Sequence, residues 1–160
     1  MTQSSLDRAS WQQDLHWVSV FLRASLGSLL LAAAVTKLPH GIAGTVGYYS
    51  SLFEQSLLPS FLVKAHASVI MFVELGLGLW LLSGYRLALA WKGAALLLVS
   101  LALGMVFAGK FDVASDNYVY VALALGGLVT ARYDRWVPGR VSEGARERGL
   151  TGGEHAAARS

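Results

Sequence analysis

The chain has 160 residues, of which 54% are hydrophobic and only 14% are charged, and its formal net charge is +3. Ordinary soluble domains carry roughly a quarter charged residues, so this composition favours a single-domain integral membrane protein. The absence of cysteine excludes thiol catalysis, disulfide exchange, iron–sulfur clusters and thiolate zinc sites within the chain. Nucleic-acid binding is not predicted, because a basic tail beside a membrane accounts for the positive charge.

Four windows are long and apolar enough to cross a bilayer, which takes roughly 20 residues. They cover residues 17–36, 65–83, 87–108 and 114–131. All three prolines lie outside them, so each helix is predicted to run unbroken. The predicted fold class is all-α: an integral membrane four-helix bundle formed by residues 17–131.

Basic residues predict the orientation of this bundle. Arginines gather near both termini and in the "SGYR" turn after the second window, whereas lysines mixed with acidic residues flank the opposite ends of the windows. Because arginine and lysine are enriched in cytoplasmic loops, both termini are predicted to be cytoplasmic. Residues 1–16 are then a cytoplasmic N-terminal segment, and residues 132–160 a cytoplasmic, basic, mobile tail.

The connection between the first two windows, residues 38–63, mixes aromatic and aliphatic residues with serine, glutamate and glutamine and is stopped by Pro59. It predicts a short amphipathic helix over residues 46–58, lying parallel to the membrane on the outer side. Its Phe53 and Leu57 side is expected to be buried on the bundle. Two roles stay open: filling the outer end of the bundle, or capping a ligand.

The stretch "VIMFVELGLGLWLL" places a single carboxylate, Glu74, among apolar residues and glycines. A charge inside a membrane needs a partner or must be neutralised. Estimated depths favour Arg23 of the first window as the partner, with Lys92 of the third as a possible additional member. Glu74 is expected to carry protons or orient a ligand, to fix which helices are neighbours, or to face another subunit.

Ligand-binding candidates gather at the outer end of the bundle, where the sequence predicts Lys37, His66 and Asn117 at or near window boundaries. Of the four histidines, only His66 lies within a window. A haem held by two histidines needs both at similar depth on facing helices, so no haem is predicted. No metal site is predicted either.

Three segments carry a resemblance to a known family: "FLRASLGSLLLAAAVTKL", "FVELGLGLWLLSGYR" and "NYVYVALALGGL". Over about residues 18–130 the chain resembles the DoxX/DoxD-type family of small four-helix bacterial membrane proteins. The resemblance implies a multi-pass protein of the bacterial inner membrane. Relatives of that type include the membrane subunit of thiosulfate:quinone oxidoreductases and proteins accompanying methylamine utilisation.

The leading functional hypothesis is a membrane subunit of a quinone-linked oxidoreductase or electron-transfer complex, with no covalent cofactor and with electrons supplied by partner subunits. Quinone would lie under the 38–63 segment, with Lys37 or Asn117 near its carbonyl and Glu74 relaying protons. The alternative is a non-catalytic assembly subunit of a larger membrane complex, and the third is a small-solute transporter. The sequence leaves open whether the chain is itself catalytic.

Overall fold

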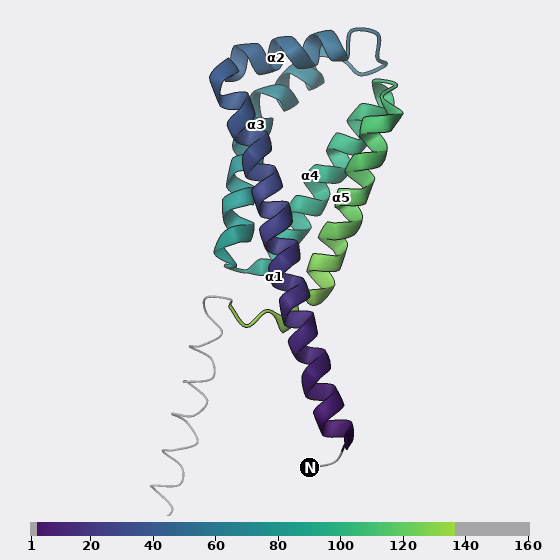
Figure 1. The fold of residues 1–160 in the computed structure, drawn as a ribbon. Helices are drawn as coiled ribbons and strands as arrows, with labels where there is room; N and C mark the ends of the chain where they lie inside the picture. Colours follow the sequence, from purple (N-terminus) through teal and green to yellow (C-terminus); the bar gives the residue numbers. More distant parts are fainter. Residues whose placement is uncertain (1–2, 137–160) are drawn as a thin grey trace, which may run out of the picture.

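The computed structural model describes residues 3–136, and this part of the chain forms an all-helical bundle without strands (Figure 1). Four long helices make up the bundle: α1 (Gln3–Lys37), α3 (Ser60–Ser83), α4 (Leu87–Phe107) and α5 (Phe111–Thr130). The shorter α2 (Gly41–Leu52) lies across one end of it. Within residues 3–136, four helical segments are long and apolar enough to cross a membrane, which confirms the predicted fold class and a multi-pass membrane protein.

The helices form two closely packed pairs, α1 with α3 and α4 with α5. Although a short turn joins α3 to α4, these two helices contact each other less than the helices within either pair. Figure 1 shows the C-terminal end of α5 beside α1. Toward the end of the bundle that α2 crosses, α5 diverges from α1. We call these the Asp134 end and the α2 end of the bundle. The looser α3–α4 seam leaves room for a cavity.

Two glycines let α1 and α3 approach closely. A Cβ atom added at Gly78 would lie 2.9 Å from Leu31 Cγ and 3.0 Å from the carbonyl oxygen of Gly27. Small residues at such a crossing allow two backbones to come within contact distance in a membrane protein. Gly78 therefore faces α1 at the point where the two helices cross.

In the α4–α5 pair, an aromatic ring packs over a glycine. Trp91 of α4 is fully buried, and its indole ring lies over Gly127 of α5, where an added Cβ would come within 2.3 Å of the ring. Glycine at this position leaves the space that the large aromatic ring fills, so the ring stabilises the pair through close packing.

The helix at the α2 end differs from its predicted boundaries. It begins at Gly41 and ends at Leu52, whereas residues 46–58 were expected to be helical. Thr45 and Tyr49, one turn apart, are buried against the bundle, but Leu57 is 91% exposed, so its expected burial was wrong. The residues before Pro59 form the turn that leads from α2, which lies across the bundle, into α3. The residue that precedes a proline is disfavoured in the helical conformation, so the helix cannot continue up to Pro59.

The segments at the two ends of the chain also differ from expectation. α1 begins at Gln3 rather than near residue 17, and Figure 1 shows its first turns extending beyond the other helices. Residues 132–136, predicted to belong to a mobile tail, pack onto the bundle, and Asp134 is fully buried. Residues 137–160, the rest of the predicted tail, lie outside the described residues.

We expect Gly78→Ala to lower the free energy of unfolding by about 1–3 kcal/mol, the usual effect of overpacking a tight contact. Gly76→Ala is the matched control, because nothing lies within 4 Å of a Cβ added there. The control is expected to leave stability unchanged or raise it by up to about 1 kcal/mol through helix propensity. Thermal unfolding in detergent measures both variants, and equal midpoints would contradict the close crossing.

Candidate functional site

Glu74 is 3% exposed and pairs with Lys37, the last residue of α1. The Lys37 Nζ donates to both carboxylate oxygens, at 2.6 Å to Oε1 and 2.5 Å to Oε2. The predicted pairing of Glu74 with Arg23 is therefore wrong.

The crossing of α1 on α3 explains this outcome. Because the two helices are antiparallel and meet at Gly27 and Gly78, Glu74 lies on the α2 side of the crossing and Arg23 on the other side. Each is one turn from its glycine, so their backbones are separated by roughly 12 Å along the helix axis. Lys37 lies on the same side as Glu74 and reaches it with its long side chain.

Arg23 instead binds Asp134, the fully buried acidic residue that follows α5. Its Nη1 lies 3.3 Å from Asp134 Oδ2, and the same carboxylate oxygen accepts a hydrogen bond from Ser19 Oγ at 3.4 Å. Oδ1 accepts a hydrogen bond from the Trp136 backbone N–H at 2.9 Å. These contacts hold the chain after α5 against α1.

His16 completes this group without forming an ion pair. Its Nδ1 is 3.8 Å from Asp134 Oδ1, but it accepts a hydrogen bond from the Arg135 backbone N–H at 3.2 Å. A nitrogen that accepts a hydrogen bond carries no proton, so the imidazole is neutral in this arrangement. Sequence reasoning missed Asp134 because it lies among arginines in a segment predicted to be mobile; its one signal was an acidic residue directly after a membrane span.

Two other predicted site residues do not join these groups. Lys92 is exposed on α4 and has no part in the Glu74 pair, so it is not a third member. The Asn117 side-chain amide donates to the Val113 carbonyl oxygen of its own helix at 3.0 Å. Lys37, the remaining predicted ligand-binding residue at this end, belongs to the ion pair with Glu74.

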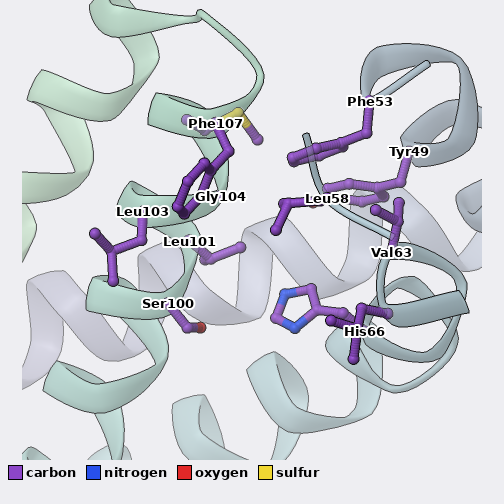
Figure 2. A pocket seen from close by; sticks show the side chains of 12 residues that line it. Tyr49, Phe53, Leu58, Val63, His66, Ser100, Leu101, Leu103, Gly104 and Phe107 are labelled. Atoms are coloured by element: carbon purple, nitrogen blue, oxygen red, sulfur yellow. The ribbon is translucent and has the colours of Figure 1, made fainter. Parts of the chain in front are cut away.

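A cavity of about 350 Å³ opens between α3 and α4 under the α2 segment (Figure 2). Its lining is mostly apolar and aromatic and comes from α2 and the segment after it, from α3 and from α4. The lining residues are Tyr49, Phe53, Leu58, Leu62, Val63, His66, Ser100, Leu101, Leu103, Gly104, Met105 and Phe107. We call this space the α3–α4 pocket.

His66 is the predicted ligand-binding residue that lines this pocket. Figure 2 shows its imidazole pointing from α3 into the space that faces Ser100 of α4, with Tyr49 and Phe53 above it. The rings of Tyr49 and Phe53 stack with centroids 6.3 Å apart. No hydrogen bond to the imidazole is found within residues 3–136, so its polar atoms are available to a ligand.

Within the described residues, no group of three or more histidine, aspartate or glutamate side chains is arranged to hold a metal ion. A haem-free protein stays a prediction. We expect the purified chain to show no Soret absorption, and a Soret band lost on His66→Ala would contradict this prediction.

The two ion pairs should respond differently to loss of their acidic partner. Asp134→Asn leaves the Arg23 guanidinium buried and charged, since it does not deprotonate, and we expect a loss of about 3–5 kcal/mol of stability. Glu74→Gln leaves Lys37, whose side chain is 22% exposed and long enough to carry its ammonium toward water, so the loss should be smaller. Chemical unfolding in detergent measures both variants.

The control is the double variant Arg23→Leu with Asp134→Asn, which removes the stranded charge and should recover part of the lost stability. If Glu74→Gln lowered stability more than Asp134→Asn, the prediction that loss of the acidic partner is more destabilising for the Arg23–Asp134 pair would be contradicted.

Comparison with known proteins identifies the family. The family profile described as "Methylamine utilisation protein MauE" matches residues 15–116, a stretch that contains the Lys37–Glu74 pair and the whole α3–α4 pocket. No curated protein and no solved structure matches the chain. The resemblance to the DoxX/DoxD-type family is therefore wrong: its motifs were short and set in apolar sequence, where glycine and leucine recur in many membrane helices. The chain belongs to the MauE family of methylamine utilisation proteins.

Proposed function

We propose that this protein is a quinone-binding membrane subunit of a redox-linked system that serves methylamine utilisation. The observation that carries the proposal is the α3–α4 pocket, an apolar cavity with an unpartnered imidazole directed into it. Its volume of about 350 Å³ lies within the range of small-molecule sites in proteins.

The chemistry of the lining fits a quinone headgroup. An uncharged, flat ring suits the aromatic and aliphatic walls, and its carbonyl oxygens need hydrogen-bond donors. The His66 imidazole and the Tyr49 hydroxyl supply such donors. Ser100 does not, because its hydroxyl already donates to the Leu97 carbonyl oxygen at 2.7 Å.

The electron balance agrees with the family. Oxidation of a primary amine to an imine releases two electrons and two protons, and reduction of a quinone to a quinol consumes the same numbers. Because the chain has no cysteine to carry electrons, a partner protein of the system supplies them. The contribution of this chain is to bind the acceptor and deliver protons to its oxygens.

We assign proton delivery to His66, the imidazole closest to the bound ring in this arrangement. Glu74 is a positioning residue: its carboxylate accepts hydrogen bonds from Lys37 Nζ of α1 and so holds α3, the helix that carries His66, against α1.

Filling the pocket should abolish quinone binding. A Cβ added at Gly104 would lie 3.5 Å from Phe53 Cζ, so the rest of the side chain in Gly104→Leu occupies the cavity. We expect binding of a short-tail quinone to weaken by at least about tenfold, or 1.4 kcal/mol. Titration of the protein in lipid nanodiscs, followed by tryptophan fluorescence, measures this affinity.

The matched control is Gly76→Leu, because Gly76 faces open space and does not line the pocket. Its affinity should equal that of the wild type. If the wild type binds no quinone, the quinone proposal fails, and the non-catalytic assembly subunit becomes the better hypothesis.

Substitution of His66 tests the hydrogen bond to the ligand. We expect His66→Leu to weaken short-tail quinone binding by about tenfold, since an unmet carbonyl acceptor in an apolar site costs about 1–1.5 kcal/mol. His66→Gln keeps a donor and should weaken binding less. Equal affinities for the leucine and glutamine variants would show that His66 does not donate to the ligand.

A further inference from the structure

A second hollow continues the α3–α4 pocket along the seam between the two helices. It has a volume of about 410 Å³ and shares His66 and Ser100 with the pocket. Beyond these shared residues its walls are apolar: Val69, Val73 and Leu77 on α3, and Gly93, Leu96 and Leu97 on α4. We call this hollow the α3–α4 groove.

The groove leads away from the α2 end. Along α3 it extends from His66 to Leu77, which is roughly 16 Å of helix at about 1.5 Å per residue. At its far end Gly93 leaves room for Leu77, because an added Cβ would lie 2.9 Å from Leu77 Cδ2. The pocket and the groove thus form one continuous path. The pocket contains the polar side chain of His66, and the groove that continues it has apolar walls.

We propose that the α3–α4 groove binds the isoprenoid tail of a long-chain quinone whose headgroup occupies the α3–α4 pocket. This inference rests on the proposed function and deepens it, since it assigns the substrate class as membrane-embedded polyprenyl quinones rather than small soluble quinones. A tail in the groove makes additional apolar contacts. Close contact with a fitted protein wall contributes dispersion attraction to the affinity.

The lining of the pocket argues against a phospholipid as the occupant of this path. A phospholipid carries an anionic phosphate, which needs arginine or lysine side chains or a cluster of N–H donors. No arginine or lysine lines either hollow. An uncharged ring with carbonyl oxygens fits the composition of the α3–α4 pocket, and an apolar branched chain fits the α3–α4 groove.

The test compares two quinones with the same headgroup, one with a single isoprene unit and one with a full-length polyprenyl tail. Val69→Phe combined with Val73→Phe fills the groove from α3. Both valines line the groove but not the pocket. We expect this variant to bind the long-tail quinone at least about tenfold more weakly than the wild type, with unchanged binding of the short-tail quinone.

The matched control is Val113→Phe combined with Val119→Phe on α5, which lines neither hollow. The exposures are comparable, 52% and 39% for Val69 and Val73 against 40% and 58% for Val113 and Val119. The control should bind both quinones as the wild type does, which separates the groove from a general effect of aromatic residues on a lipid-facing surface.

The possible outcomes separate this inference from the proposed function. If the wild type binds both quinones equally tightly, or the groove variant keeps full long-tail affinity, the tail lies in the bilayer and the inference is overturned while the proposed function stands. If the wild type binds neither quinone, the proposed function fails.

A direct measurement covers the case in which the groove variant does not fold. A long-tail quinone with a photoreactive diazirine on its tail is crosslinked to the wild-type protein in nanodiscs, and the labelled peptides are identified by mass spectrometry. Labels within residues 69–77 of α3 and 93–97 of α4 support the inference. Labels confined to α5, or spread evenly over the lipid-facing helices, overturn it.

Discussion

The crossing of α1 on α3 at Gly27 and Gly78 sets the relative position of every charged group inside this bundle. Two glycines in contact fix both the distance between the helices and their relative shift along the axis. Once that shift is set, Lys37 can reach Glu74 and Arg23 cannot. Arg23 is left at the other end of the bundle, where Asp134 provides the compensating charge.

The two ion pairs have different structural roles because they lie at opposite ends. The Arg23–Asp134 group, with Ser19 and Trp136, fastens the chain after α5 to α1. It thereby closes the bundle at the end where the two helix pairs come together. The Lys37–Glu74 pair joins α1 to α3 at the end where α2 crosses the bundle. This pair makes no link between α3 and α4.

The open α3–α4 seam leaves space for a cavity in so small a protein. If all four long helices packed equally tightly, side chains would fill the interior to the density of an ordinary core. Here two tight pairs meet along one loose seam, and the roof formed by Tyr49 and Phe53 encloses its α2 end. The imidazole of His66 comes from α3 and the hydroxyl of Tyr49 from the roof, whereas α4 contributes mainly apolar residues.

The sequence alone predicted the four membrane-spanning helices and the helix that crosses one end of the bundle. This was possible because hydrophobicity and helix length are local properties that the thickness of a bilayer constrains directly. It also singled out His66, which lines the α3–α4 pocket, because a polar residue within an apolar span stands out against its surroundings; its binding of a ligand stays a prediction.

The partners of the buried charges were decided only by the tertiary structure. The choice of Lys37 over Arg23 for Glu74 depends on how far one helix is shifted against the other, and this shift is set by contacts such as Gly27 with Gly78 that no local pattern encodes. The burial of Asp134 likewise depends on Ser19 and Arg23, which lie more than a hundred residues earlier in the chain. Sequence determined which segments enter the membrane, because that depends on each segment by itself; tertiary packing determined which side chains meet, because that depends on pairs of segments.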